Sequence, residues 1–218
     1  MKKIVVFDLD DTLYNEIDYL NSAFREIAEY LEATYSISNI YDFMLQKYSE
    51  GQNVYDEINK NYSLNISKEK FLLLYRNHIP DIQLDNATKT TLTILQKNDC
   101  ILGIITDGRE ITQTRKIKAL ALSKFFEQGN IIISESFGSE KPSSANYTYF
   151  EKKYSNSKFY YIGNSTEKDF VAPNKLGWTT ICILDNGKHI HKQDFSLSKE
   201  YLPKYNVRNL IEIYNLIF

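Results

Sequence analysis

Near its start the chain runs Ile4-Val5-Val6-Phe7-Asp8-Leu9-Asp10-Asp11-Thr12-Leu13. The apolar part, Ile4–Phe7, is rich in β-branched and aromatic residues and too short for a helix, which is typical of a buried parallel strand. Three aspartates follow at once, so the apolar run is also far too short for the core of a secretory signal peptide, despite the two lysines before it. We therefore expect a strand that ends in an acidic turn.

Further segments of the chain resemble this first strand in length and composition: Ile101–Ile105, Ile131–Ile133, Phe159–Ile162 and Thr179–Leu184. Segments with helical periodicity lie between or after them, marked by Ile111, Ile117, Leu120 and Leu122, by Tyr147, Phe150 and Tyr154, and by the run Val207–Ile217. Alternating strands and helices predict the α/β class, with a Rossmann-like doubly wound parallel sheet as the core.

One long region breaks the alternation. Residues 14–84 contain no convincing strand and are typical of several consecutive helices, with helix boundaries expected near Ser38, Gly51 and Ser67. Because this block follows the first strand directly, we interpret it as an all-helical cap domain inserted into the α/β core. The core would then comprise residues 1–13 and 85–218.

The composition is that of an ordinary globular chain. The 218 residues carry 26 basic and 28 acidic side chains, so the chain lacks the basic surplus that nucleic-acid binding requires. No apolar stretch reaches the roughly 20 residues that span a bilayer. Cys100 and Cys182 lie beside or inside strand-like segments, where buried free thiols are expected. We expect a cytoplasmic protein without nucleic-acid or membrane partners, and nothing in the sequence demands more than a monomer.

Polar residues follow the other predicted strands as well. Thr106-Asp107-Gly108 follows the second strand, Glu140-Lys141-Pro142 comes after the third, and Gly163-Asn164-Ser165 follows the fourth, with Asp169 just beyond. Any one of these residues alone is more often a cap or a turn. Since ligands of open parallel sheets bind at the carboxyl ends of the strands, all of them together predict a charged site at that edge.

These motifs resemble the haloacid dehalogenase superfamily, in its phosphatase branch with a helical cap after the first motif. The resemblance covers nearly the whole chain, and the stretch Asp8–Leu13 is its most specific part. Thr106–Gly108, Lys141-Pro142 and Gly163–Asp169 are weak singly and strong together. The resemblance implies a Mg²⁺-dependent phosphatase that acts on a small phosphorylated metabolite, such as a sugar phosphate or a nucleotide-like compound.

The resemblance also assigns roles. Asp8 would be the nucleophile, since a carboxylate that attacks phosphorus splits one difficult displacement into two easier ones through an aspartyl-phosphate. Asp10 would act as general acid and base. In an extended strand these two side chains would point to opposite faces, so the backbone has to curl after Asp8. Lys141 would hold the nucleophile and the phosphate oxygens.

The remaining motif residues would bind the phosphoryl group and the metal. Thr106 and the amides of Asp107 and Gly108 would donate hydrogen bonds to phosphoryl oxygens. Magnesium prefers oxygen ligands, and the resemblance implies four sources for them: Asp8, the backbone carbonyl of Asp10, Asn164 and Asp169.

Two positions depart from the family pattern. Asn164 stands where an aspartate metal ligand is common, so we expect weaker metal binding, with Glu167 compensating in part through water. This leaves open a phosphate-binding or regulatory protein; a phosphomutase also remains an alternative, whereas Asp10 disfavours a dehalogenase. Asp107 stands where many relatives carry Asn, and we expect it to face the leaving group or to pair with Arg109. The histidines form no triad or zinc pattern, and we place His189 and His191 in a surface turn.

Overall fold

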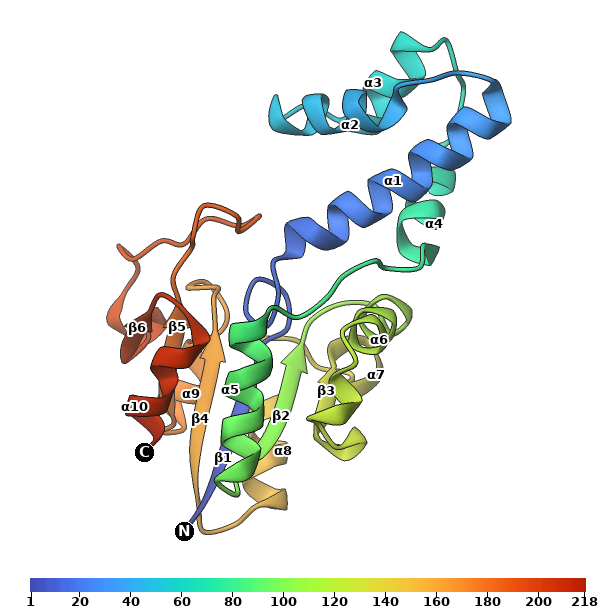
Figure 1. The fold of residues 1–218 in the computed structure, drawn as a ribbon. Helices are drawn as coiled ribbons and strands as arrows, with labels where there is room; N and C mark the ends of the chain where they lie inside the picture. Colours follow the sequence, from blue (N-terminus) through green and yellow to red (C-terminus); the bar gives the residue numbers. More distant parts are fainter. The chain divides into compact units, whose positions relative to one another are not determined.

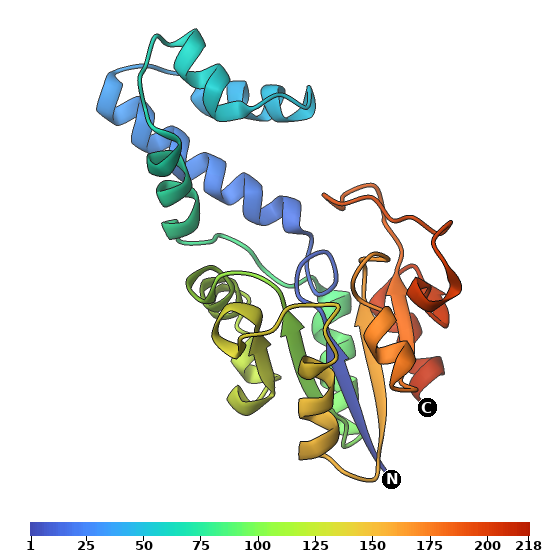
Figure 2. The ribbon, with the colours of Figure 1, turned by 180° about the vertical axis from the view of Figure 1, so that it is seen from behind.

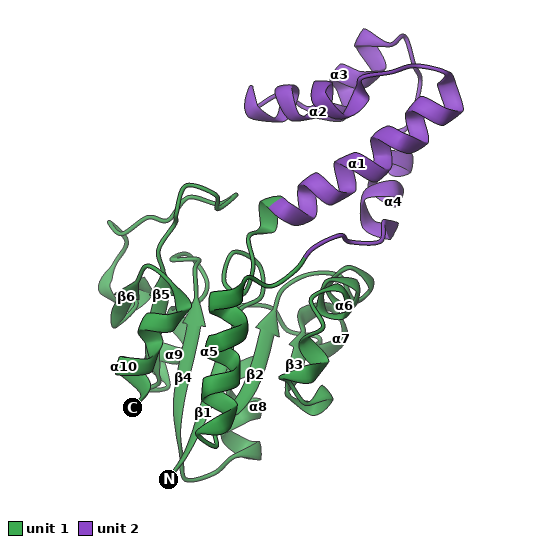
Figure 3. Cartoon of the chain, viewed as in Figure 1, with its two compact units in different colours: residues 1–17, 83–218 green, residues 18–82 purple.

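The computed structural model describes all 218 residues and divides into two compact units (Figure 3). One unit consists of residues 1–17 and 83–218, and the other of residues 18–82. The predicted limits of the cap were residues 14 and 84. None of the helices is both long and apolar enough to cross a membrane.

The larger unit is built on one parallel sheet with the strand order β3-β2-β1-β4-β5-β6, which confirms the predicted α/β fold class. Its strands are β1 (Lys2–Phe7), β2 (Ile101–Thr106), β3 (Ile131–Ile133), β4 (Ser157–Gly163), β5 (Thr179–Ile183) and β6 (Tyr205–Val207). Phe7 at the end of β1 pairs with Ile104 of β2 and with Ile162 of β4. The polar residues after these three strands therefore meet at one edge of the sheet.

Helices cover both faces of this sheet. Helix α5 (Asn86–Lys97) lies over the face nearer the viewer in Figure 1, and α8 (Ala145–Lys153) lies over the opposite face, seen from the front in Figure 2. The other helices of this unit are α6 (Glu110–Ala119), α7 (Ser134–Phe137), α9 (Val171–Lys175) and α10 (Tyr214–Ile217), with 3₁₀ turns at Leu122–Lys124, Gln128–Asn130, Lys199–Tyr201 and Leu210–Ile213. On the α8 face, Tyr147 and Phe150 pack with strand residues and Trp178 in a buried cluster.

The end of the chain differs from the sequence-based prediction. A helix was expected from Val207 to Ile217, but Val207 ends strand β6 and only Tyr214–Ile217 is α-helical. The reason is tertiary: Val207 pairs with Ile183 of β5, and its carbonyl accepts a hydrogen bond from the Leu184 amide. Local periodicity could not reveal this sheet contact. Helix α5 was likewise not identified from the sequence.

The smaller unit is helical, as the sequence predicted for this region. It contains most of α1 (Glu16–Tyr35), together with α2 (Ile40–Ser49), α3 (Val54–Asn61) and α4 (Lys68–Asn77). Ser67 caps α4, since its hydroxyl accepts a hydrogen bond from the Lys70 amide. Gly51 follows the end of α2 with a positive φ of 70°, a conformation that glycine adopts without strain.

Candidate active site

The turn after β1 reverses the chain within a few residues. The amides of Thr12 and Leu13 both donate to the Leu9 carbonyl, and Asp11 adopts a left-handed conformation with φ 55°. The Asp11 carboxylate holds this turn in place, because it accepts hydrogen bonds from the amides of Glu16 at 2.7 Å and Ile190 at 3.0 Å. As a result, the side chains before and after the turn line the same cavity.

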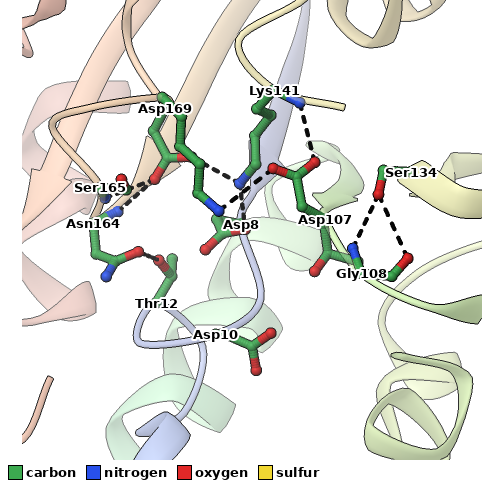
Figure 4. A network of polar contacts seen from close by, with 12 residues as sticks. Asp8, Asp10, Thr12, Asp107, Gly108, Ser134, Lys141, Asn164, Ser165 and Asp169 are labelled. Atoms are coloured by element: carbon green, nitrogen blue, oxygen red, sulfur yellow. Dashed lines mark hydrogen bonds and ion pairs between the residues drawn. The ribbon is translucent and has the colours of Figure 1, made fainter. Parts of the chain in front are cut away.

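Asp8 faces a buried lysine that it shares with a second carboxylate (Figure 4). The Lys141 Nζ lies 2.6 Å from Asp8 Oδ1 and 2.7 Å from Asp169 Oδ1. The other oxygen of Asp169 accepts hydrogen bonds from the amides of Asn164, at 3.0 Å, and Ser165, at 2.8 Å. Asp169 therefore anchors both the lysine and the turn after β4.

Glycine is required at the end of β4 for this arrangement. A Cβ atom at Gly163 would lie 2.5 Å from Asp169 Oδ2, closer than real Cβ contacts allow. The Tyr161 hydroxyl, on the same strand, donates a hydrogen bond to Asp169 Oδ1 at 3.2 Å and accepts one from Lys141 at 3.3 Å. Strand β4 thus supplies both the space and a polar partner for the buried pair.

Burial and charge affect these groups differently. Desolvation raises the pKa of Asp8 to about 7, against the lowering effect of Lys141, and the Asp169 charge adds to the rise. Burial alone would lower the pKa of Lys141, but Asp169 and Asp8 together raise it well above the ordinary lysine value. Lys141 is therefore a permanent cation in the resting site.

The Asp10 carboxylate is held from the other side of the turn. Its Oδ1 accepts hydrogen bonds from the Tyr14 hydroxyl and from Lys116 Nζ, the latter at 2.7 Å, and its Oδ2 accepts one from Gln113 at 2.9 Å. Burial raises its pKa, but the Lys116 charge and these three hydrogen bonds lower the pKa below the usual value overall. Glu16 lies 3.7 Å from Lys116, and burial together with the Asp10 charge raises the pKa of Glu16 to about 7.

The residues after β2 are tied to both sides of the site. The Thr106 hydroxyl accepts a hydrogen bond from Gln113 at 2.6 Å. Asp107 accepts one from the backbone amide of Lys141 at 3.1 Å and pairs with Lys168 at 3.4 Å. The charge of Asp107 is thus partly neutralised by a cation after β4.

Of the two roles expected for Asp107, the pairing with Arg109 is wrong. Arg109 instead lies 3.6 Å from Glu135 of α7, because the chain turns away after Gly108 and α6 begins at Glu110. The Gly108 amide donates to the Ser134 hydroxyl at 3.0 Å. In the resting structure this amide is therefore engaged with α7.

A cavity of about 420 Å³ joins these parts of the larger unit. Five of the predicted site residues line it: Asp8, Asp10, Thr106, Asp107 and Asn164. Gly108, Lys141 and Asp169 do not line it, and the last two lie behind its wall. Glu167, which was expected to act at the metal site through water, also lines the cavity. The rest of the lining consists of residues to which the sequence assigned no role: Asp11, Glu16, Ser165, Lys168, His191 and Lys192.

The loop between β5 and β6 supplies the part of this wall that sequence reasoning missed. The Gln193 side chain donates to the carbonyls of Asn164, at 2.8 Å, and Ile183, at 2.7 Å. The Asp194 amide donates to the Thr166 hydroxyl at 2.9 Å. These bonds fix the loop against the turn after β4. His191 is exposed in a bend of this loop, as expected, and it also lines the cavity. No motif marks this loop, and β6, which ends it, was not predicted.

The cavity can accommodate a hard divalent cation, although no three His, Cys, Asp or Glu side chains are grouped as a ready metal site. Asp8 engages Lys141 through Oδ1 only, which leaves Oδ2 for another partner. The Asn164 amide oxygen accepts one long hydrogen bond, 3.5 Å from the Thr12 hydroxyl. Asp169 differs from the expectation, since both of its oxygens are already engaged and its side chain is fully buried. The oxygen donors that fit Mg²⁺ are thus those of Asp8, Asn164 and the backbone near Asp10.

Known proteins resemble this chain along most of its length. The model of the haloacid dehalogenase-like hydrolase family matches residues 5–183. The chain is 28% identical to a glyceraldehyde 3-phosphate phosphatase of Methanocaldococcus jannaschii, over 100% of this chain and 97% of the relative. It is 26% identical to a protein of the same name from Methanopyrus kandleri, over 84% of each.

Solved structures share the fold. The HAD-hydrolase YfnB from Bacillus subtilis, bound to magnesium, superposes with a TM-score of 0.69 at 20% identity, over 99% of this chain and 98% of that one. A HAD phosphatase from Thermococcus onnurineus gives 0.61 at 22% identity, over 99% and 97%. A 2-haloacid dehalogenase from Pseudomonas syringae pv. Tomato DC3000 gives 0.65 at 20% identity, over 99% and 98%. Phosphatases and dehalogenases thus share this fold, so fold alone does not decide the reaction.

Proposed function

The chain belongs to the haloacid dehalogenase-like hydrolases, and on that basis we propose that it is a Mg²⁺-dependent phosphatase of a small sugar phosphate. One observation carries the proposal: Asp8 is bonded to the buried cation Lys141 and lines one cavity together with Asp10. A nucleophilic carboxylate, a fixed cation and a second carboxylate are the groups that phosphomonoester hydrolysis through an aspartyl-phosphate requires.

In the first step an Asp8 oxygen attacks the phosphorus atom. The bond from phosphorus to the ester oxygen breaks, its electron pair goes to that oxygen, and Asp10 supplies the proton that makes the leaving group an alcohol. In the second step water attacks the phosphorus of the aspartyl-phosphate, and Asp10 accepts a proton from this water. The bond from phosphorus to the Asp8 oxygen then breaks, which restores the carboxylate and releases inorganic phosphate.

The resting protonation of Asp10 suits the second step. Lys116 and the hydrogen bonds to Asp10 favour its carboxylate form, which is the base that the attacking water needs. The first step needs the acid form. A phosphoryl group placed beside Asp10 adds negative charge, which raises the pKa of Asp10. Proton uptake would therefore accompany substrate binding.

Other residues would bind rather than react. Lys141 keeps Asp8 in place and offers positive charge toward the phosphoryl group, and the Thr106 hydroxyl and the Asp107 amide would donate to phosphoryl oxygens. Mg²⁺ would be held by Asp8, Asn164 and the Asp10 carbonyl; when bound, it supplies positive charge that brings anionic nucleophile and anionic substrate together. Asp169 would orient Lys141 and the Asn164 turn.

The substrate class follows from the relatives and from the helical unit. The similar curated proteins are named for glyceraldehyde 3-phosphate, so we propose a short-chain sugar phosphate, with this compound as the first to test. Residues 18–82 would act as the cap that selects the leaving group and excludes water. A phosphomutase would differ mainly in how such a cap holds a bisphosphorylated intermediate.

The decisive experiment measures Mg²⁺-dependent phosphate release from a panel that includes glyceraldehyde 3-phosphate. We expect Asp8→Asn to lower kcat/KM by at least about 10³-fold, because the amide is not a nucleophile. Asn164→Asp should lower the Mg²⁺ concentration needed for half-maximal activity, since it adds a charged ligand. Asp99→Asn, at an exposed position of the larger unit that does not line the cavity, is the matched control and should change nothing.

The same experiment tests the non-catalytic alternative, which the uncharged Asn164 favours. A protein that binds phosphate without hydrolysing it would show no turnover as wild type, and activity would appear only in Asn164→Asp. Turnover that survives in Asp8→Asn would contradict the aspartyl-phosphate route altogether.

A further inference from the structure

Two side chains of helix α6 hold Asp10 although neither lines the cavity. Lys116 and Gln113 donate to different oxygens of the same carboxylate, at 2.7 and 2.9 Å. Positions three apart on a helix lie on one face, so a single face of α6 delivers both donors. This arrangement fixes the carboxylate at both of its oxygens.

The burial of these donors argues against a chance contact. Only 4% of the Lys116 side chain is exposed, and Gln113 is 2% exposed. Burying an ammonium group is costly unless a partner compensates for the lost hydration. The partners here are Asp10 and, at 3.7 Å, Glu16, so the position of Lys116 is determined by the carboxylates of the site.

Gln113 also connects Asp10 with the end of β2. Its Nε2 donates to Asp10 Oδ2 and to the Thr106 hydroxyl, the latter at 2.6 Å. The side chain is packed tightly in this position, because a Cβ atom at Gly108 would lie 3.2 Å from its carbon atoms. One amide group thus links the proposed acid–base residue to a proposed phosphate-binding residue.

We propose that Gln113 and Lys116 are positioning residues, which place the Asp10 carboxylate for proton transfer to the leaving oxygen. This inference rests on the proposed function, since it assumes that Asp10 transfers that proton. Proton transfer needs the donor within hydrogen-bond distance of its target, and an acid–base side chain is effective only when its rotamer is fixed. Without the two α6 side chains, Asp10 would keep only Tyr14 as a direct donor and would sample other rotamers.

The test compares two substrates that differ in their need for an acid. The alkoxide leaving group of glyceraldehyde 3-phosphate requires a proton, whereas p-nitrophenolate is stable enough to leave without one. kcat/KM reports events up to the first irreversible step, so it isolates the leaving-group step from the later attack of water. The variants are Gln113→Leu and Lys116→Met, with Asp10→Asn as the reference and Lys118→Met, on the exposed face of α6, as the matched control.

We expect each α6 variant to lower kcat/KM for glyceraldehyde 3-phosphate by about 10- to 100-fold, a part of the roughly 10²–10⁴-fold that acid–base catalysis provides. The value for p-nitrophenyl phosphate should fall less than about threefold, and Lys118→Met should leave both values unchanged. Equal losses on the two substrates would show a merely structural role and would overturn the inference. So would unchanged kinetics in both α6 variants.

Two further measurements keep the inference testable on its own. If Lys116→Met does not fold, as judged by thermal unfolding, Lys116→Arg keeps the charge but moves it, and it should show the same selective loss. A crystal structure of Gln113→Leu should show the Asp10 carboxylate in a new rotamer, and an unchanged rotamer would overturn the inference even without an active enzyme. If Asp10→Asn itself lacks the substrate dependence, the role of Asp10 in the proposed function fails instead.

Discussion

Asp8 and Asp10 lie two residues apart and each contacts a buried lysine, yet their surroundings affect them in opposite directions. The pKa of Asp8 is raised to about 7 by burial, and that of Asp10 is lowered by Lys116 and its hydrogen bonds. Each lysine lies near a second carboxylate, Asp169 beside Lys141 and Glu16 beside Lys116. Only Asp10 also accepts hydrogen bonds from neutral donors, the side chains of Gln113 and Tyr14. The extra hydrogen bonds to Asp10 lower its pKa, whereas Asp8 has none beyond Lys141 and its pKa is raised further by the nearby Asp169 charge.

The difference shows what the resting site lacks. A nucleophile should be ionised and a general acid protonated, but the resting structure raises the pKa of Asp8 to about 7 and lowers that of Asp10. A cation at Asp8 would lower its pKa, and a phosphoryl anion beside Asp10 would raise that of Asp10. The two ligands of the proposed reaction are thus the two charges that would bring each carboxylate into its working form.

Among the variants that test the difference between Asp8 and Asp10, Lys141→Met should lose the most free energy of unfolding. The substitution leaves Asp8 and Asp169 buried together without a cation, and such an uncompensated site costs about 3 kcal/mol of the free energy of unfolding. Lys116→Met is the matched variant on the other side, and we expect about half of that loss. The Asp10 side chain is 18% exposed and keeps two neutral donors, whereas Asp169 is fully buried.

Urea denaturation at pH 8 and pH 5 measures both variants. At pH 5 the loss from Lys141→Met should shrink, because the buried carboxylates take up protons in the folded variant and one charge is removed. Equal losses from the two substitutions at pH 8 would show that the neutral donors to Asp10 do not compensate for the missing cation.

A smaller loss of free energy of unfolding should follow from Gly163→Ala. This substitution disturbs the Asp169–Lys141 pair beside Asp8 without removing a charge. The new methyl group would press on Asp169 at 2.5 Å and displace the carboxylate from Lys141 and from the turn after β4. We expect a loss of about 2 kcal/mol in the free energy of unfolding, as for overpacked cores. Gly129→Ala is the control, because its methyl group meets only the flexible end of Lys153. If both variants unfold at the same urea concentration, the close approach at Gly163 is not structurally important.

The motif residues that follow the strands, Asp10 among them, could be predicted from the sequence, but the side chains that hold Asp10 in place could not be assigned a role. Asp8, Lys141 and Asn164 follow or approach strand ends, and strand ends of a parallel sheet meet at one edge. Parallel strands are short apolar runs that local composition reveals, so the core of the fold could be predicted as well. The direction of the Asp169 side chain could not, because it depends on backbone amides that only the folded turn brings together.

Gln113 and Lys116 show why the remaining roles in the site could not be predicted from the sequence. In sequence they lie on a polar, charged stretch that is typical of a solvated helix face. They are buried only because α6 packs its polar face against the turn after β1, more than 100 positions away in the chain. The position of His191 in the cavity wall could not be predicted for a similar reason. Its loop is fixed to the site by hydrogen bonds from Gln193 and Asp194, and no local sequence pattern indicates these bonds.

The smallest effect concerns Glu16, which lies 3.7 Å from Lys116. Its pKa is raised from 4.5 to about 7, chiefly by burial and then by the Asp10 charge, so the folded chain keeps this proton at pH values where the unfolded chain has lost it. The folded chain therefore binds more protons than the unfolded chain between about pH 4.5 and 7, and the contribution of Glu16 to stability falls as the pH rises through this window.

Glu16→Gln removes that loss. The free energy of unfolding of the variant should therefore exceed that of wild type by about 1 kcal/mol at pH 8 and match it near pH 4. Asp8 contributes a slope of the same sign to both proteins, which cancels in the difference, and Glu127→Gln on the exposed surface serves as the control. The free energies of unfolding of the variant and of wild type are measured by urea denaturation from pH 4 to 8. If their difference stays constant over this range, Glu16 does not cause the predicted pH dependence.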